Sequence, residues 1–351
     1  MRISLNTQSD LRVNRHYGYG KSFVEIQNAF RNFSYNGKKF VVEFNSPKSY
    51  VQMYYGPHPV HNSHYKNQYK IHMSQTESDR FEEHKVLQYS SANEFWTANE
   101  WGRDAAIRSG IPEEKVFVYH HGINPEAYHP FLRGRNDKIR FLHIDSGSPR
   151  KRSDLVEKAF NILYKKNKNI ELTLKYSHSP HLDHSWMDRD VLENAGYWIR
   201  PGTRHIKENL TERELVSLIN FHDVLVYPSE GEGFGMIPLE ALATGMPVIS
   251  THEWSPYAKY FESGHLISQI KPSKVDWGYA KVGNGTIPEL DSVIEKMQYF
   301  IDNINALSAN YFNQVEDIKK EFSWQNKTDK FLTSFIERVG VDTFKTLYNR
   351  F

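Results

Sequence analysis

The sequence predicts an α/β protein built from two doubly wound, Rossmann-like domains. Its 351 residues are enough for two domains with separate hydrophobic cores. Through the first half, short β-prone runs alternate with helix-length segments, which is typical of a parallel sheet covered by helices. The same pattern restarts with an apolar run at Ile139, so a second sheet is expected there.

In the first half, helices are expected at Lys21–Arg31, Arg80–Tyr89 and Glu100–Ser109, the last ended by Gly110 with Pro112 following. The expected strands are Arg2–Asn6, Phe40–Phe44, Val51–Tyr55, Tyr69–Met73, Glu94–Thr97 and Val116–Tyr119.

In the second half, strands are expected at Ile139–Ile144, Ile170–Lys175 and Asp223–Tyr227, and helices at Arg152–Lys165 and Glu212–Asn220. Thr211 and Glu214 are spaced as a capping box that opens the second of these helices. Helical periodicity dominates from Ile287 to Ile336. We therefore expect domains at 1–128 and 139–330, a linker at 129–138, and a final helix at 331–351 that packs back on the first domain.

Composition narrows the class of protein. No apolar run approaches the ~20 residues of a membrane span. The chain enters a strand directly after Met1, which predicts no secretory peptide. The absence of cysteine excludes disulfides and thiolate-bound metals. We expect a soluble, cytoplasmic protein without membrane insertion.

Positive charge is concentrated at the start of the chain. Met1–Lys70 holds ten Lys and Arg against three Asp and Glu, a net +7, whereas the whole chain carries only +2. Such a segment suggests an anionic partner, and a surface of solvated lysines explains it about as well.

The most informative segment is Pro228–Ile249, in which a glycine-rich loop joins a strand to a helix that starts near Met236. The first backbone N–H groups of such a helix, with its positive end, bind an anion, most often phosphate. Glu232 and Glu240 lie eight positions apart in the same segment, and sugar hydroxyls are the natural partners of carboxylates there. Phosphate and hydroxyls together suggest a nucleotide-sugar.

This Glu-x7-Glu pattern, within E-G-F-G-x-x-x-L-E-A-L-A-x-G-x-P-V-I, resembles the donor-site signature of the retaining family 4 glycosyltransferases, which have the GT-B fold with an interdomain cleft. The resemblance implies that Glu232 binds the donor sugar and Glu240 the ribose. The remaining donor-binding residues that it implies are Gly233, Phe234, Gly235, Met236 and Ile237. The plain strand-turn-helix edge of any doubly wound domain is the alternative.

A basic segment follows the first strand of the second domain, where the family has its phosphate-binding G-R-x-x-x-x-K-G. On that alignment Lys151 is the family's lysine, Ser146 replaces its arginine, and Arg150 supplies the missing charge. Fixed cations stabilise a departing diphosphate without a metal. We therefore expect no cofactor besides the nucleotide-diphosphate sugar itself. A basic helix start without a ligand is the alternative.

Two features of the first domain complete the predicted site. His72 ends a strand at the edge where open α/β sheets bind ligands, and the resemblance implies a catalytic position beside the donor sugar, although a lone histidine is often structural. Gly18 belongs to Gly18-Tyr19-Gly20, which resembles the family's glycine-rich loop near the diphosphate. The acceptor-binding candidates on this loop are Arg12, Arg15, His16, Tyr17 and Tyr19.

Basic and aromatic side chains interleaved on one loop suit a nucleic-acid strand, and nearly as well a phosphorylated or lipid-linked acceptor. His58-x-x-His61-x-x-His64 has no nearby carboxylate that would complete a metal site, so a polar loop is expected there. A polar loop is expected as well for the stretch with His178, His181 and His184.

The resemblance implies transfer of a sugar from a nucleotide-diphosphate donor, with UDP as the expected nucleotide, to a hydroxyl group. The compact, phage-like first domain and its charge favour 5-hydroxymethylcytosine, or another hydroxymethylated base, in bacteriophage DNA, which would have to be flipped out of a duplex. A transferase of cell-surface polysaccharide or lipid-linked glycan synthesis is the first alternative. A non-catalytic nucleotide- or DNA-binding protein on the same fold is the second.

Overall fold

The chain divides into two compact units. Unit 1 contains Met1–Gly122 together with Lys320–Phe351, and unit 2 contains Ile123–Lys319. The computed structural model describes residues 1–7, 18–56, 68–131, 137–176, 201–207, 209–277 and 281–344.

Unit 1 is built on a parallel sheet with the strand order β4-β1-β5-β6-β7-β8. Its strands are β1 Arg2–Asn6, β4 Val41–Phe44, β5 Val51–Tyr55, β6 Tyr69–Met73, β7 Glu94–Thr97 and β8 Val116–Val118. Its helices are α1 Gly18–Asn32, α2 Glu83–Ser90, α3 Glu100–Arg108 and α10 Trp324–Val339. The antiparallel strands β2 Ser34–Tyr35 and β3 Lys38–Lys39 form a small hairpin before β4.

The central strands of this sheet are buried on both faces. Every residue of β5 and of β7 is buried, as expected for a parallel sheet that is covered by helices on both sides. One core cluster joins Phe95 of β7 to Tyr89 of α2 and Ala106 of α3. These strands were predicted with the same bounds because most of their residues are β-branched, aromatic or apolar.

The helix α10, near the C-terminus, belongs to unit 1. Phe331 packs edge-on against Trp96 of β7 and stacks on Tyr119, with ring centroids 4.6 and 4.8 Å apart. Arg338 forms two hydrogen bonds of 3.0 Å to the buried Glu94 carboxylate. Unit 1 ends at Gly122 and resumes at Lys320. The sequence predicted these two boundaries at residues 128 and 331.

Unit 2 is built on a second parallel sheet, with the strand order β11-β10-β9-β12-β13. Its strands are β9 Ile139–Asp145, β10 Ile170–Tyr176, β11 Thr203–Ile206, β12 Val224–Tyr227 and β13 Val248–Ser250, with the antiparallel pair β14 Gln269–Lys274 and β15 Asn284–Pro288. Its helices are α4 Ser153–Lys166, α6 Glu212–Phe221, α7 Met236–Ala243 and α8 Leu290–Asn313, and α9 Val315–Phe322 crosses the boundary back to unit 1.

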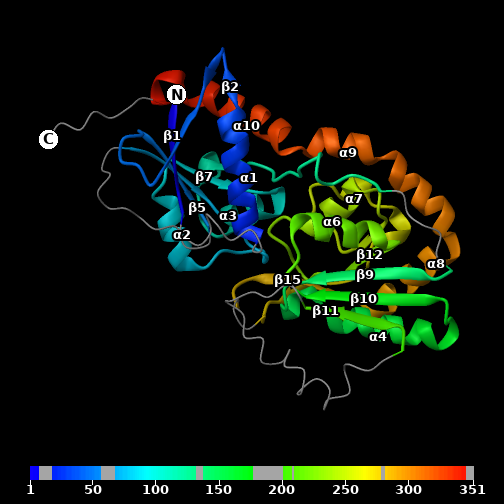
Figure 1. Cartoon of the computed structure of the whole chain (residues 1–351). Helices are drawn as coiled ribbons and strands as arrows, with labels where there is room; N and C mark the ends of the chain where they lie inside the picture. The colour runs from blue at the N-terminus through cyan, green and yellow to red at the C-terminus, as the bar shows by residue number, and fades with distance from the viewer. Residues whose placement is uncertain are drawn as a thin grey trace. The chain divides into compact units, whose positions relative to one another are not determined.

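The core of unit 2 lies between the sheet and two helices. Val156 and Phe160 of α4 and Phe300 of α8 pack with strand residues in one cluster. In Figure 1, α6 and α7 lie on the other side of the sheet from α4. The predicted capping box is present, since Thr211 accepts from the Glu214 N–H and the Glu214 side chain accepts from the Thr211 N–H.

Some predicted elements were wrong or missing. Ile287, expected to start a helix, lies in β15, and the helix begins at Leu290. The sequence also did not predict β11, β13, the β14–β15 pair or the β2–β3 hairpin, although the Asn36-Gly37 turn of that hairpin is a known signal, with both residues at positive φ. Of these strands, β2, β3, β11 and β13 are two to four residues long, too short for a clear hydrophobic period.

Within the described ranges, no helix is both long and apolar enough to cross a membrane. The same ranges contain no group of three or more His, Asp or Glu side chains placed to hold a metal ion. The histidines at 58, 61, 64, 178, 181 and 184 lie outside them.

Candidate functional site

The candidate site lies where the strand order of unit 2 reverses. The chain runs outward from β9 through β10 to β11, and then returns to add β12 on the other side of β9. In open parallel sheets, ligands bind at the carboxyl ends of the two strands that flank this reversal. The segments that follow β9 and β12 are the two that the sequence singled out, those of Lys151 and of Glu232.

The segment after β9 forms a tight, buried turn. The Asp145 carboxylate accepts from the backbone N–H groups of Gly147 and Ser148 at 2.7 and 3.1 Å, which fixes the start of the turn. Pro149–Lys151 then form one 3₁₀ turn, in which Arg150 and Lys151 are both buried. We call Asp145–Lys151 the phosphate loop, after its predicted role.

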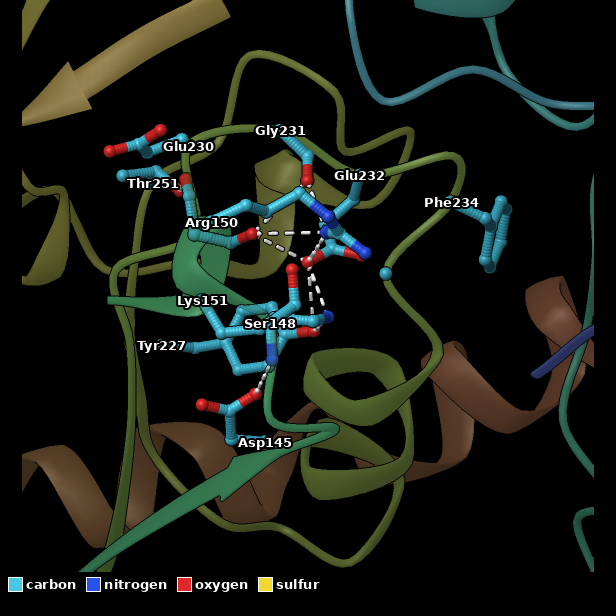
Figure 2. Close-up of polar contacts among 12 residues, drawn as sticks. Asp145, Ser148, Arg150, Lys151, Tyr227, Glu230, Gly231, Glu232, Phe234 and Thr251 are labelled. Atoms are coloured by element: carbon cyan, nitrogen blue, oxygen red, sulfur yellow. Dashed lines mark hydrogen bonds and ion pairs between the residues drawn. The ribbon is translucent and has the colours of Figure 1, made fainter. Parts of the chain in front are cut away.

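Four polar groups converge on one oxygen of the Glu232 carboxylate (Figure 2). Lys151 Nζ lies 2.5 Å from this oxygen, Arg150 Nη1 2.7 Å, the Ser229 hydroxyl 2.6 Å and the Tyr227 hydroxyl 3.0 Å. Arg150 also donates to the Gly231 carbonyl, and Lys151 to the Tyr227 hydroxyl. We call Arg150, Lys151, Tyr227, Ser229 and Glu232 the Glu232 cluster.

Burial and neighbouring charges shift the pKa values of Glu232 and Lys151 within the cluster. Burial by itself would raise the pKa of Glu232, but the charges of Arg150 and Lys151 outweigh it and lower the pKa to about 2. Burial lowers the pKa of Lys151, while the attraction of Glu232 opposes that change. Glu232 therefore supplies the negative charge that compensates the buried Arg150 and Lys151.

A second set of contacts holds the two segments together. Arg152 adopts the left-handed conformation, with φ of 56°, and pairs with both Asp154 and Glu230 at 2.9 Å. Glu230 in turn accepts from the Trp277 indole N–H, and its backbone carbonyl accepts from Thr286 of β15. The β14–β15 region therefore braces the segment that carries Glu232.

The glycine-rich loop ends at Gly235, directly before α7. Gly235 has φ of 78°, and a Cβ there would overlap the Trp254 ring, so no other residue fits this position without strain. Its carbonyl accepts from the Tyr257 hydroxyl. Gly233 and Phe234 are buried, and Met236 and Ile237 are half-buried at the helix start. In Figure 2, Phe234 lies on the same loop but apart from the cluster.

The structure thus brings together Arg150, Lys151 and Glu232, which the sequence proposed as one group. Glu240 lies in α7, with only 1% of its surface exposed. Two members of the cluster were not predicted, Tyr227 and Ser229. Their position at the end of β12, within five residues of Glu232, was the available signal.

The predicted site residues of unit 1 lie outside the Glu232 cluster or outside the described part of the chain. Gly18 begins α1, and the Tyr19 hydroxyl donates to the Gln75 carbonyl at 3.3 Å. Arg12, Arg15, His16 and Tyr17 lie outside the described residues.

His72 lies near the C-terminal end of β6, as the sequence predicted, but its side chain is buried. Its side chain has no exposed surface, and its ring lies 5.2 Å from that of Tyr54 and 5.7 Å from that of Tyr89. The reason is the covering helix, because Tyr89 belongs to α2, which packs over this part of the sheet. Its place is that of a core histidine, and a catalytic role for it stays a prediction.

Known proteins resemble this chain in sequence and in fold. Residues 126–276 match the family model described as glycosyl transferases group 1. A D-inositol 3-phosphate glycosyltransferase of Paenarthrobacter aurescens is 28% identical over 221 residues, and an uncharacterized glycosyltransferase 335 of Sulfolobus islandicus rod-shaped virus 1 is 30% identical over 173. These matches cover 62% and 46% of this chain and 46% and 48% of the relatives, so the chain spans about half the length of each.

Solved structures show the same architecture. Anabaena Alr3699/HepE in complex with UDP-glucose matches 97% of this chain and 100% of its own, with a TM-score of 0.66 and 11% identity. WaaG, a glycosyltransferase involved in lipopolysaccharide biosynthesis, matches 95% of this chain and 100% of its own, with a TM-score of 0.59 and 15% identity. The predicted fold class is confirmed: the chain has the GT-B fold, with two Rossmann-like domains.

Proposed function

We propose that this protein is a retaining glycosyltransferase that moves a sugar from a nucleotide-diphosphate donor, with UDP as the nucleotide, to a hydroxyl group. The observation that carries the proposal is the Glu232 cluster, which places two buried cations beside the glycine-rich start of α7 at the reversal point of a parallel sheet. No other part of the described residues combines these features.

The geometry suits a departing diphosphate. Arg150 and Lys151 carry two positive charges, and Glu232 offsets one of them. Fixed cations in a buried site stabilise the charge that develops on a leaving group, since they need no reorganisation as it forms. The backbone N–H groups of Met236 and Ile237, at the start of α7, add donors for phosphate oxygens. On this proposal Glu232 contacts the donor sugar and Glu240 the ribose.

The comparisons support the part of this proposal that concerns a glycosyltransferase with a nucleotide-sugar donor. The matched family model and the named relatives are glycosyltransferases, and one similar structure contains UDP-glucose. UDP is therefore the nucleotide to test first.

Loss of UDP release in a Lys151→Ala variant tests the catalytic proposal. The purified protein is incubated with UDP-glucose or UDP-N-acetylglucosamine and acceptors, and free UDP is measured. We expect the variant to lose about 10²–10³-fold in kcat, as when one transition-state donor is removed. The matched control is Lys138→Ala, which removes an exposed lysine paired to Glu171 at 2.7 Å. Equal rates in the two variants would contradict the proposal.

For the acceptor we propose a hydroxymethylated base in DNA, 5-hydroxymethylcytosine first. Support comes from the net +7 of Met1–Lys70 and from the viral source of one relative. DNA that contains 5-hydroxymethylcytosine should raise UDP release above unmodified DNA, and mass spectrometry of its nucleosides should show an added hexose. If UDP release is the same with modified and unmodified DNA but rises with a glycan or lipid-linked acceptor, that acceptor takes the place of DNA in the proposal.

A further inference from the structure

Glu230 connects the phosphate loop to the β14–β15 strand pair. Its backbone N–H donates to the Arg150 carbonyl at 2.9 Å, and its own carbonyl accepts from the N–H and the hydroxyl of Thr286 at 3.2 and 3.0 Å. One oxygen of its carboxylate accepts from the Trp277 indole N–H at 2.5 Å, and the other from Arg152 at 2.9 Å. Trp277 follows β14, and Thr286 lies in β15. Glu230 therefore joins three segments of unit 2 that are separate in the chain.

Trp277 also contacts the phosphate loop directly. The guanidinium carbon of Arg150 lies over its ring, 6.0 Å from the centroid, which is the range of a cation–π contact. Only 4% of Trp277 and 8% of Arg150 are exposed, and such a contact is stronger where water is excluded. Gly285 of β15 lies against both partners, since a Cβ there would come 3.3 Å from the Glu230 carbonyl oxygen and 3.4 Å from the Trp277 ring.

Arg150 is thus held from two sides. Its Nη1 pairs with Glu232 at 2.7 Å and donates to the Gly231 carbonyl, while the Trp277 ring packs against the guanidinium. A guanidinium is a planar fork of donors, so the direction of its plane decides which oxygens it can reach. A contact through one nitrogen would by itself leave that plane able to turn. The packed ring restricts the turn.

We infer that Trp277 and Glu230 are positioning residues, through which the β14–β15 strand pair holds Arg150 in the orientation that meets the donor diphosphate. The part that concerns the donor rests on the proposed function. Donors stabilise a leaving group when their orientation is fixed before its charge develops. A misplacement of about 1 Å can cost about 10²-fold in rate. Trp277 is almost wholly buried, so it acts through Arg150 rather than on the donor itself.

Substitution separates the two contacts of Trp277. Trp277→Phe keeps a ring beside Arg150 but removes the N–H that Glu230 accepts, whereas Trp277→Leu removes both. Under the conditions in which the wild type releases UDP, we expect kcat to fall about tenfold in the first variant and about 10²-fold in the second. The loss in kcat should exceed any rise in the donor KM, because the charge on the diphosphate grows as the sugar leaves. An unchanged kcat in Trp277→Leu would overturn the proposal.

A double-mutant cycle with Arg150 tests whether Trp277 acts through it. Arg150→Ala removes the group that Trp277 is inferred to orient, so adding Trp277→Leu to that variant should cause little further loss of kcat. Two independent losses would multiply instead, and that result would overturn the inference. Each variant is assayed below its own unfolding midpoint, so that loss of stability is not mistaken for loss of rate.

Trp96→Phe is the matched control, because Trp96 makes the same kind of contact in unit 1. Its indole N–H donates to the Glu94 carboxylate at 2.6 Å, and Glu94 also binds an arginine, Arg338. The substitution removes a buried indole–carboxylate hydrogen bond far from Arg150 in the chain. Thermal stability should therefore fall while kcat stays that of the wild type. An equal loss of kcat in Trp96→Phe and Trp277→Phe would mean that the effect is not specific to Trp277.

The orientation of Arg150 can also be followed without any ligand. In ¹⁵N-arginine-labelled protein, the side-chain Nε–H signal that disappears in Arg150→Lys belongs to Arg150. We expect hydrogen exchange at this signal to be severalfold faster in Trp277→Leu than in the wild type, and unchanged in Trp96→Phe. An Arg150 signal that is the same in Trp277→Leu and in the wild type would overturn the positioning role, whatever the reaction is.

The two experiments distinguish failure of this inference from failure of the proposed function. If the wild type releases no UDP with any donor and acceptor, the proposed function fails, and the Arg150 signal alone decides whether Trp277 positions Arg150. If the wild type releases UDP but neither kcat nor the Arg150 signal responds to Trp277→Leu, the proposed function stands and the positioning role is wrong.

Discussion

At the scale of the residue, Glu232 shows how neighbours decide the charge of a buried group. Burial alone would neutralise its carboxyl, yet the cations and hydroxyls around it keep it ionised and lower its pKa to about 2. An unfolded glutamate titrates near 4.3. Ionisation of Glu232 therefore stabilises the folded state above about pH 5, and this contribution is lost as the pH falls toward 2.

Replacing Glu232 by glutamine should remove part of the acid sensitivity of the fold. The pKa difference corresponds to about 3 kcal/mol at neutral pH. The variant also leaves Arg150 and Lys151 without their anion, which costs about 3–5 kcal/mol. Urea unfolding at pH 7 should show this loss, and between pH 5 and 3 the variant should lose less stability than the wild type. Glu171→Gln, at an exposed pair, serves as the control. Parallel pH profiles for wild type and Glu232→Gln would contradict this account.

At the scale of the element, the start of α7 depends on one glycine. Gly235 and Gly37 have nearly the same φ, 78° and 75°, but a Cβ at Gly235 would overlap Trp254, whereas nothing lies within 4 Å of a Cβ at Gly37. The pair therefore separates the cost of the backbone conformation from the cost of the overlap.

Gly37→Ala should lower the free energy of unfolding by about 1 kcal/mol, since only the left-handed conformation is penalised. Gly235→Ala should lower it by about 2–4 kcal/mol, because the overlap adds to that penalty. Thermal unfolding of both variants measures the difference. Equal losses would mean that Trp254 moves aside freely, and the glycine would then matter for its backbone alone.

At the scale of the whole molecule, the chain leaves unit 1 at Gly122 and returns to it at Lys320. Within that unit, Arg338 of α10 binds Glu94 of β7 through two hydrogen bonds of 3.0 Å. Glu94 also accepts from the Tyr69 hydroxyl and the Trp96 indole, so its buried carboxylate is fully engaged. Removing the cation that pairs with such a buried carboxylate lowers the stability of the fold strongly.

Arg338→Ala should destabilise unit 1 by about 3–5 kcal/mol, because it leaves the Glu94 charge buried without its partner. Arg338→Lys should recover part of this, as it restores the charge but not the two-pronged geometry. Hydrogen exchange at β7 and α10 reports the local effect. If Arg338→Ala and the double variant with Glu94→Gln unfold at the same urea concentration, the ion pair does not hold the helix.

Local patterns were enough for much of the fold. Buried strands such as Val51–Tyr55 and Tyr69–Met73, and the Thr211–Glu214 cap, were predicted with their observed bounds because each depends on residues within a few positions. The glycine-rich loop and the basic turn were recognised for the same reason. The burial of His72 was not predicted because its neighbours Tyr54 and Tyr89 come from β5 and α2, which the strand's own sequence does not reveal.

The sequence by itself determined the α/β architecture, most of the longer helices and strands, and the two segments that carry Lys151 and Glu232, because each of these depends on residues close together in the chain. Only the tertiary structure decided that Lys151 donates to a carboxylate oxygen of Glu232, 81 positions further along the chain. Burial and distance set the charge of such groups, and both arise only when separate strands of the sheet come together.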